Sequence, residues 1–396
     1  MNKLPGDQPA GAGPGALGGL GDRGARGDLV GPIAAAEMDV DAWHAVLAAA
    51  HRHDRPSTPA PERATEAGRL RVPSPRSRTV AFALPAPGDS GDHAGVALLR
   101  LFDTEENAGN AFLDTLTVHP AHRGRGVGRA LWAEVCAVLA AEGRTSVGTL
   151  VQRGGAGEKF AVAQGAECAL PLVAYVQEVA GASEVGEVAV EEGRAGAVGG
   201  AGPAGHAVPA APAVPTAPAT PAARAGEPRE PVTAPDGYRF AVWSGVVPDV
   251  HAVAHARAHD AMEDAPTGDL DEQHDPWDAE RVRAAARVVL DRGGVMLTVA
   301  AVAEADGAVA GYTELVLPTP QSVRALQYDT VVIPGHRGHG LGRAVKLRML
   351  EYLRGQWPGV REIMTTVADE NRPMRAVNAA LGYRPEDRMG VYQVRL

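Results

Sequence analysis

A nine-residue pattern that could bind an anion occurs twice in the chain. His122-Arg-Gly-Arg-Gly-Val-Gly-Arg-Ala130 returns as His336-Arg-Gly-His-Gly-Leu-Gly-Arg-Ala344, with seven of the nine positions identical at an offset of 214 residues. Glycines allow a turn at positive φ and a close approach of a ligand to the backbone. The first N–H groups of a helix that follows such a turn point outward at the positive end of the helix dipole. Each copy therefore predicts a pyrophosphate cradle, with Arg123 and Arg129, or Arg337 and Arg343, as charge-assisted partners.

Other phosphate-binding turns fit the pattern less well. A nucleoside-triphosphate loop ends in Gly-Lys-Ser or Gly-Lys-Thr, whereas both copies end in Gly-Arg-Ala. A Rossmann turn has the spacing G-x-G-x-x-G after the first strand of its domain, whereas this turn has G-x-G-x-G after a later strand. The simpler alternative is a tight turn without a ligand, but such a turn would not need the flanking His-Arg and Arg-Ala twice.

The residues around each copy predict a strand before the turn and a helix after it. Residues 112–118 alternate apolar and polar side chains and precede Pro120, and residues 326–333 are rich in β-branched side chains and precede Pro334. Apolar residues then recur at helical spacing. They are Leu131, Val135 and Val138 after the first turn, and Leu341, Val345, Met349 and Tyr352 after the second.

The remaining sequence divides the chain into two globular parts. Residues 1–28 are rich in Gly and poor in large apolar side chains, which predicts a disordered tail. Residues 181–235 are rich in Pro, Ala and Gly and predict an extended linker that proteases can cleave to release two stable fragments. The parts at 29–180 and 236–396 each have the length of one domain.

The two parts have the same order of predicted elements. In the first we expect a helix at 40–50, strands at 79–84 and 95–101, the motif unit, a strand at 146–151, a short helix near 159–163 and a strand at 170–176. In the second we expect a strand at 238–243, helices at 249–261 and 278–291, a hairpin of strands at 295–302 and 308–317, the motif unit, a strand at 362–367, a helix at 372–381 and a strand at 389–396.

The composition excludes several classes of protein. The formal net charge of −10 argues against general binding to nucleic acid, although a local basic site remains open. No run of about 18 apolar residues predicts a membrane span, and the N-terminus lacks the pattern of a signal peptide. Cys136 and Cys168 follow no metal-ligand spacing, so we expect both to be small buried hydrophobic residues. These features predict a cytoplasmic protein.

The turn resembles the acyl-CoA signature of the GNAT superfamily of N-acyltransferases. The segment from Asn371 to Tyr383, which reads Asn-Arg-Pro-Met-Arg-Ala-Val-Asn-Ala-Ala-Leu-Gly-Tyr, is similar to the second conserved block of that superfamily. The resemblance covers almost everything outside the tail and linker. It implies two α/β (α+β) domains in tandem, each a mixed, mostly antiparallel sheet flanked by helices, whose fourth and fifth strands splay to admit the pantetheine arm.

The resemblance also implies acetyl-CoA or another short acyl-CoA as the cosubstrate, with its pyrophosphate held by the amides of 125–128 and of 339–342. The implied cofactor-binding residues of the first half are Val118, Arg123, Gly124, Arg125, Gly126, Val127, Gly128 and Arg129. Those of the second half are Val332, Arg337, Gly338, His339, Gly340, Leu341, Gly342 and Arg343.

The chain departs from the superfamily at the proton donor for the leaving thiolate. Many members carry a tyrosine four residues before the glycine of the second block, where this chain has Ala161 and Asn378. The first half also has Gly154 in place of Asn371. We therefore expect catalysis mainly in the second half, with Asn371 and Asn378 among its site residues.

The base that deprotonates the amine should lie near the second motif strand. Glu314 and Asp329 are the candidates, and Tyr328 is a poorer one because a phenol titrates near 10. Alternatively, Glu314 is a surface strand residue and Asp329 starts or caps the strand pairing. The backbone N–H of Val332 is a candidate donor to the oxyanion.

The acceptor is expected to be a primary amine, with a positive charge. Eight acidic residues and no Lys or Arg lie between residues 260 and 278, where they could form a carboxylate-lined rim or only a solvated loop. They are Asp260, Glu263, Asp264, Asp269, Asp271, Glu272, Asp275 and Asp278. His251, His255 and His259 recur every four residues, and we interpret this spacing as a coincidence of one helix face rather than a metal site. No metal is expected.

The sequence thus predicts a tandem acyl-CoA-dependent N-acyltransferase that works as a monomer or a homodimer. A CoA-binding regulatory module with little catalysis is the alternative, because both halves lack the tyrosine. A nucleotide-dependent phosphotransferase would bind ATP in place of CoA, and the missing Lys-Ser/Thr argues against it.

Overall fold

The computed structural model describes residues 30–56, 58–88, 91–179, 231–264 and 266–396. The predicted tail at 1–28 and almost all of the predicted linker at 181–235 lie outside the described residues. Within the described part of the chain, no helix combines the length and the apolar character needed to span a membrane.

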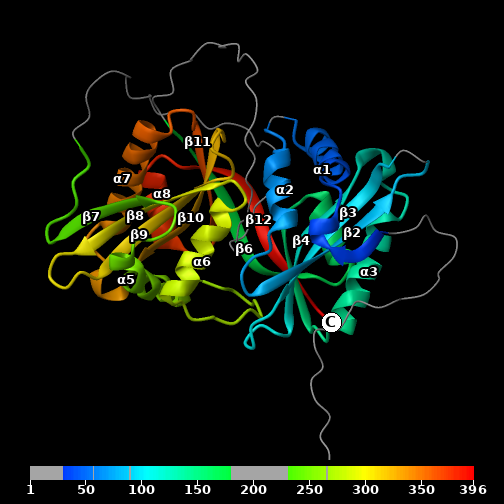
Figure 1. Ribbon diagram of the computed structural model, residues 1–396, viewed down its shortest axis with the longest axis horizontal. Helices are drawn as coiled ribbons and strands as arrows, with labels where there is room; N and C mark the ends of the chain where they lie inside the picture. The colour runs from blue at the N-terminus through cyan, green and yellow to red at the C-terminus, as the bar shows by residue number, and fades with distance from the viewer. Residues whose placement is uncertain (1–29, 57, 89–90, 180–230, 265) are drawn as a thin grey trace, which may run out of the picture.

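The two halves repeat one order of elements (Figure 1). The first half has the strands β1 (Val30–Ala34), β2 (Ser77–Pro85), β3 (His93–Phe102), β4 (Asn110–Val118), β5 (Ser146–Gln152) and β6 (Glu167–Glu178). Its helices are α1 (Val40–Asp54), α2 (Arg63–Arg71), α3 (Val127–Ala141) and α4 (Ala156–Ala163). The second half has the strands β7 (Tyr238–Ser244), β8 (Val295–Ala303), β9 (Val309–Leu317), β10 (Arg324–Val332), β11 (Glu362–Ala368) and β12 (Arg384–Arg395). Its helices are α5 (Asp249–Asp260), α6 (Ala279–Leu290), α7 (Leu341–Gln356) and α8 (Arg372–Ala380).

Every predicted element is present, but β1 and α2 were not predicted and β12 begins five residues earlier than expected. The start of β12, Arg-Pro-Glu-Asp-Arg, is polar and contains a proline, so no apolar alternation marks it as a strand. The two cysteines are only half-buried, so the expectation that both are buried is wrong.

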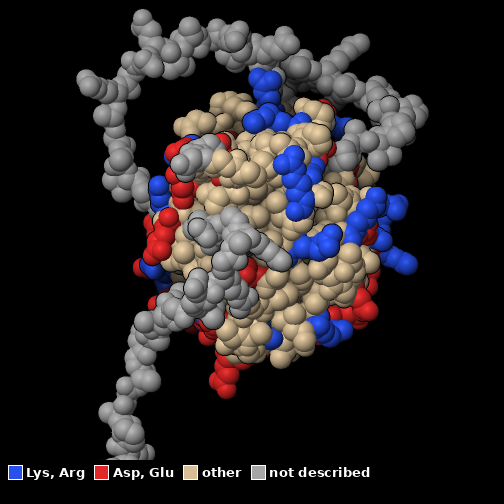
Figure 2. All heavy atoms as spheres, turned by 90° about the vertical axis from the view of Figure 1, so that its right-hand side faces the viewer, with Lys and Arg blue, Asp and Glu red and all other residues tan. Residues whose placement is uncertain are grey.

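Helices cover both faces of the sheet. In the second half, Leu341, Val345 and Met349 of α7 pack on one face, and α5 packs through Ala252 and Ala256 on the other. The first half repeats this layering, with α3 on one face and α1 with α2 on the other (Figure 1). On the face of the first half shown in Figure 2, Lys and Arg side chains lie in separate groups with acidic side chains near them. That face therefore carries mixed charge.

The two halves share a single sheet, because each contributes its last strand to the other. The strand order is β1-β2-β3-β4-β5-β12-β6-β11-β10-β9-β8-β7. The last strand of the chain, β12, thus pairs with β5 of the first half, and β6 pairs with β11 of the second half. The two exchanged strands pair with each other in the middle of the molecule (Figure 1). The halves are therefore two copies of one motif but not two separate sheets.

Each half has a point where its sheet opens. The parallel pairing of β10 with β11 lasts only from Arg324 to Leu326, and that of β4 with β5 only from Asn110 to Phe112. Beyond these residues the two strands separate, as expected for a splayed fourth and fifth strand. Both motif strands also carry a bulge at this level, which shifts the register between β9 and β10 and between β3 and β4.

The exchanged strands change the expected result of linker cleavage. We predict that a single cut between residues 181 and 230 leaves the two pieces associated in native buffer, because separating them would break the pairing of β5 with β12 and of β6 with β11. Size-exclusion chromatography of the cleaved protein checks this, with urea as the control that separates the pieces. Two fragments that elute apart in native buffer would show that the halves complete their sheets alone.

Candidate active site in the second half

The second glycine turn leads directly into the N-terminus of α7. Gly340 is the N-cap residue with a left-handed φ of 73°, and no side chain caps the helix. A Cβ built at Gly340 would meet no atom within 4 Å, so the space beside the turn is open. The N–H groups of Leu341, Gly342 and Arg343 lie in the first turn of the helix, where no preceding helical carbonyl can accept their hydrogen bonds. The turn therefore fits a pyrophosphate on backbone geometry alone.

The arginine at the start of each turn forms a hydrogen bond with the backbone of the strand that precedes the turn. The Nε of Arg337 donates to the carbonyl of Val332 at 3.1 Å, and the Nε of Arg123 donates to the carbonyl of Val118 at 3.2 Å. Arg123 also forms two hydrogen bonds of 2.7 Å with the carboxylate of Asp54. Arg123 is thus paired within the protein, and a bound anion would compete with Asp54 for its guanidinium group.

A cavity of about 320 Å³ lies in the second half between α5, α6 and the strands β8 to β10. Trp243 and Trp277 form aromatic parts of its wall. The ionisable groups that line it are His255, His259, Tyr328, Glu314 and Asp329. An apolar pocket with a few convergent polar groups of this kind is the usual form of a small-molecule site.

Four of these groups form one cluster, in which His255, His259 and Glu314 are buried and Asp329 is partly exposed. Glu314 is only 3% exposed, and its Oε1 lies 3.0 Å from the Nε2 of His255 and 3.5 Å from the Nε2 of His259. The Nδ1 of His259 lies 3.7 Å from the Oδ2 of Asp329. The ring of Tyr312 packs against both imidazoles, with centroids 4.5 and 4.7 Å away.

The surroundings of the cluster give its two carboxylates very different pKa values. Burial alone would raise the pKa of Glu314, but the charge of His259 and the hydrogen bonds from both histidines lower it to about 2. Burial raises the pKa of Asp329 to about 6, because His259 offsets only part of that effect and Glu314 adds to it. Burial lowers the pKa of His255, whereas Glu314 outweighs burial at His259 and raises its pKa. Glu314 therefore stays ionised, while Asp329 can exchange a proton near neutral pH.

The bulge in β10 places Asp329 in the cavity. Gln327 pairs with Leu315 and Thr330 pairs with Thr313, so Tyr328 and Asp329 together lie opposite Glu314 alone. The extra residue turns both side chains toward the wall of the cavity. Glu314 is thus a buried strand residue, and the alternative of a surface position is wrong for it.

Comparison with known proteins agrees with this geometry. The model of the GNAT family of acetyltransferases matches residues 42–156 and 255–383, which is more than half of the chain. The chain belongs to the GNAT acetyltransferase family. Each of its halves is one GNAT unit, and acyl transfer from acetyl-CoA is the general activity of the family.

Two solved structures are similar in fold over almost the whole chain. A tandem GNAT protein from the clavulanic acid biosynthesis pathway is 27% identical, with a TM-score of 0.68 over 93% of this chain and 98% of that one. A GCN5-related N-acetyltransferase from Sphaerobacter thermophilus is 17% identical, with a TM-score of 0.55 over 93% of this chain and 95% of that one. No curated protein sequence matches the chain.

The first GNAT unit has an apolar residue in place of one carboxylate of the cluster and an ion-paired carboxylate in place of the other. Leu98 lies three residues after Gly95, which pairs with Val118, just as Glu314 lies three residues after Gly311, which pairs with Val332. The bulge of β4 carries Asp114, but Arg100 holds both of its carboxylate oxygens at 2.7 and 3.1 Å. Leu98 packs instead with apolar neighbours under α1. At these two equivalent positions the first unit therefore offers no unpaired carboxylate as a counterpart of Asp329.

The two asparagines predicted for the second site have different places. Asn371 is the N-cap of α8, where its side chain accepts the N–H of Met374 at 3.2 Å, and it does not line the cavity. The structure thus assigns Asn371 a capping role. Asn378 is fully buried, and its Oδ1 accepts a hydrogen bond of 2.8 Å from the Nζ of Lys346.

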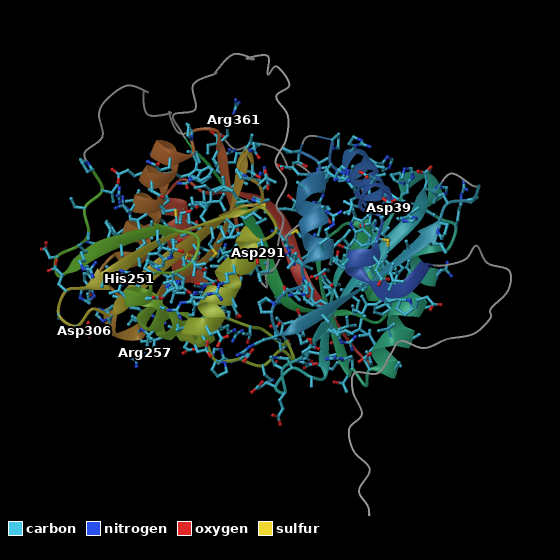
Figure 3. The ribbon with its side chains drawn as sticks, viewed as in Figure 1. Asp39, His251, Arg257, Asp291, Asp306 and Arg361 are labelled. Atoms are coloured by element: carbon cyan, nitrogen blue, oxygen red, sulfur yellow. The ribbon has the colours of Figure 1, made fainter. Side chains whose placement is uncertain are left out.

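The histidine spacing on α5 is only partly a coincidence. His251 stacks on Trp243 with ring centroids 5.8 Å apart, on the outer side of the second half (Figure 3). The interpretation as a helix-face coincidence is wrong for His255 and His259, which both reach Glu314. The contact of His255 and His259 with Glu314 depends on how α5 packs on β9, and the sequence shows no local sign of that packing.

The acidic segment at 260–278 does not form a free rim. Asp271 pairs with Arg395 of the exchanged strand at 2.9 Å, and Asp275 pairs with Arg76 of the first half. Asp278 caps α6, and Asp260 accepts the N–H of Trp277. Most of the described carboxylates of this segment therefore serve contacts between halves or helix ends, and the negative charge of the cavity comes from Glu314 and Asp329.

The cluster has the ligands of a metal site, but its surroundings favour a proton. His255, His259 and Glu314 each offer one atom within 4.8 Å of the others. A metal on the Nε2 of His255 would leave a protonated Nδ1 without a hydrogen-bond partner among the described residues. Such a buried donor costs about 1–3 kcal/mol. With the proton on Nε2, donated to Glu314, the Nδ1 is only an unused lone pair.

We predict that the purified protein holds far less than one equivalent of zinc per chain and that chelation leaves its acyltransferase activity unchanged. Elemental analysis and assays after dialysis against EDTA check this. One equivalent of tightly held metal that depends on Glu314 would contradict the proton assignment.

We predict that Gly340→Val abolishes acyl-CoA binding by the second half, because the side chain blocks the approach to the α7 amides. Gly307→Val is the matched control, since Gly307 has a φ of 75°, lies in the β8–β9 turn, and has equally open space, with no atom within 4 Å of an added Cβ. Both variants should lose about 1–3 kcal/mol of unfolding free energy from backbone strain. Calorimetry with acetyl-CoA on proteins that also carry Gly126→Val measures binding at the second turn alone. Equal acetyl-CoA affinities of Gly340→Val and Gly307→Val in that background would refute the assignment of the second turn as the pyrophosphate site.

Proposed function

We propose that this GNAT protein transfers an acetyl or other short acyl group from acyl-CoA to a primary amine, and that the second half performs the reaction. The observation that supports this most is that β10 carries Asp329 in the wall of an acidic, aromatic-walled cavity and leads into the glycine turn, which has open space beside it. In the first half the equivalent positions carry Leu98 and an Asp114 that is paired with Arg100.

Asp329 is the general base of the proposed reaction. An amine must lose a proton before it attacks a thioester, and a base works best when its pKa lies near the working pH. Of the two carboxylates, Asp329 has its pKa raised to about 6 and lines the cavity, whereas the pKa of Glu314 is lowered to about 2. Glu314 then acts as a positioning residue that holds His255 and His259.

The acceptor is proposed to be a cationic amine of small size. Two carboxylates against one protonated histidine leave the lining of the cavity with net negative charge, which attracts cations. Trp243 adds aromatic surface to the lining, whereas the ring of Trp277 already contacts His259 and the guanidinium of Arg281. A pocket of about 320 Å³ suits an amino sugar, a polyamine end or a basic side chain.

We predict that Asp329→Asn lowers kcat with acetyl-CoA and a cationic amine by about 100-fold or more. In the wild type, activity should rise as pH increases through about 6, because Asp329 must lose its proton to act as a base. That rise should vanish in the variant. Glu304→Gln, which removes an exposed carboxylate from the β8–β9 turn, is the control. A full rate and an unchanged pH profile for Asp329→Asn would exclude Asp329 as the base.

We predict that Gly340→Val removes most of the turnover, whereas Gly126→Val in the first turn retains it. Cationic amines should react with a lower KM than neutral amines of the same size, and added salt should reduce that advantage. Steady-state assays with both variants at low and high salt measure both effects. Turnover that depends on Gly126 would assign the reaction to the first half, and a KM indifferent to charge and salt would exclude the cationic acceptor. A chain that binds CoA without turning over any amine would favour the regulatory module.

A further inference from the structure

A buried lysine lies where the second half opens. Lys346 on α7 is 5% exposed, and its Nζ donates to the Oε1 of Gln327 on β10 and to the Oδ1 of Asn378 on α8, both at 2.8 Å. It therefore bridges β10 to α8 just beyond Leu326, where the pairing of β10 with β11 ends. Burying an ammonium group is costly, and the hydrophobic face of α7 has no packing need for a lysine at this position.

The lysine is joined to the acceptor cavity through one side chain. Gln327 lines the cavity, and its Oε1 also accepts the hydroxyl of Tyr383 at 2.5 Å. The Nε2 of Gln327 donates to Thr313 at 2.6 Å, so this amide is fixed from both ends. The Nδ2 of Asn378 is a buried donor with no partner among the described residues, so the network beside Lys346 contains one unused hydrogen-bond donor.

The first half has no such network. At the offset of the repeated pattern, Lys346 corresponds to Trp132 and Gln327 to Leu113. Asn378 lies four residues before Gly382, and the residue four before Gly165 in the first half is Ala161. Trp132 and Leu113 belong to the apolar core under α3. The buried lysine is thus specific to the half whose cavity carries the carboxylates.

We propose that Lys346 is the general acid that donates a proton to the sulfur of the departing CoA in the second half. This inference rests on the proposed acyl transfer. Lys346 is a residue of α7 beside the opening between β10 and β11, and Asp329 lies in the cavity that His255 and His259 of α5 also line. A thioester in that opening would have the amine and its base on one side and the proton donor on the other.

The proton balance of the step is complete. The amine nitrogen bonds to the acyl carbon, the carbon–sulfur bond breaks, and the sulfur leaves with the electron pair of that bond. Lys346 gives one proton from Nζ to the sulfur, which forms the thiol and leaves a neutral amine on Lys346. Asp329 takes the protons that the attacking ammonium group loses and passes them to solvent, from which Lys346 is recharged. One proton is released overall.

The surroundings of Lys346 suit a proton donor near neutral pH. Burial lowers the pKa of Lys346 to about 7. The groups that contact its Nζ are Gln327 of β10, Asn378 of α8 and the ring of Tyr383, whose centroid lies 4.8 Å away and whose hydroxyl pKa is raised by burial. No carboxylate is among these contacts. A thiol has a pKa of about 8.5, so proton transfer from such a lysine to the thiolate is favourable.

The low lysine content of the chain allows a direct measurement. The sequence contains only Lys3, Lys159 and Lys346, so protein labelled with ¹³C at lysine Cε should give three resonances. We expect one of them, absent in Lys346→Met, to titrate near pH 7 in the full chain without CoA, well below the ordinary range of a lysine. A resonance of Lys346 that titrates above about pH 9.5 overturns the proposal, whatever the enzyme acylates.

Kinetics with two acyl donors separates chemistry from packing. With acetyl-CoA, Lys346→Met should lower kcat by about 100-fold, and activity should no longer fall as pH rises through about 7. With the selenoester analogue, whose selenolate leaves without a proton, the same variant should lose less than about tenfold. Equal losses with both donors would mean a merely structural role and would overturn the proposal.

Controls keep the result interpretable. Lys159→Met removes an exposed lysine of the first half and should change neither donor's kcat. Tyr383→Phe removes the neighbouring hydroxyl, and its activity should still fall as pH rises through about 7. If that pH-dependent fall disappears in Tyr383→Phe, the general acid is Tyr383. Thermal unfolding and acetyl-CoA affinity confirm that Lys346→Met is folded. Wild-type protein that acylates no amine would contradict the proposed function, and the lysine titration would still decide the state of Lys346.

Discussion

An unpaired sheet edge determines the architecture of this protein. Neither β5 nor β11 can gain a further partner from its own half, because the next strand, β6 or β12, pairs across to the other half. An open row of N–H and C=O groups would otherwise remain in the middle of the molecule, where it would pair with any other chain. The mutual pairing of β6 with β12 closes both halves at once, and the ion pair of Arg395 with Asp271 secures the end of the exchanged strand.

The two halves show how one backbone can support different chemistry. Both carry a bulge at the same level of the motif strand and a glycine turn with a left-handed N-cap residue. Around the second bulge the side chains are Glu314, Asp329 and two buried histidines, whereas around the first they are Leu98 and the Arg100–Asp114 pair. The geometry is inherited from the fold, and the difference in charge comes from a few side chains that face the opening.

The glycine turns, the strands beside them and the family could be predicted from the sequence because their signals are local. A left-handed residue before a helix requires glycine, and Gly126 and Gly340 are at those positions. The strand exchange could not be predicted, since β12 has the same alternation whichever half it joins. The meeting of His255 with Glu314 also depends on how α5 packs on β9. Lys346 did leave a signal, as a lysine beside Val345 within a buried helix face of a chain with only three lysines.

The exchange of β12 also fixes when the first half can mature during synthesis. The β12 strand spans Arg384–Arg395, yet its place is between β5 and β6, whose residues leave the ribosome more than 200 residues earlier. At a synthesis rate of about 5–20 residues per second, the edges of β5 and β6 wait roughly 10–40 seconds for their partner. During that interval they resemble the open edges that recruit chaperones or neighbouring nascent chains. Truncated products that lack the last dozen residues would therefore leave both halves, and not only the second, without a finished sheet.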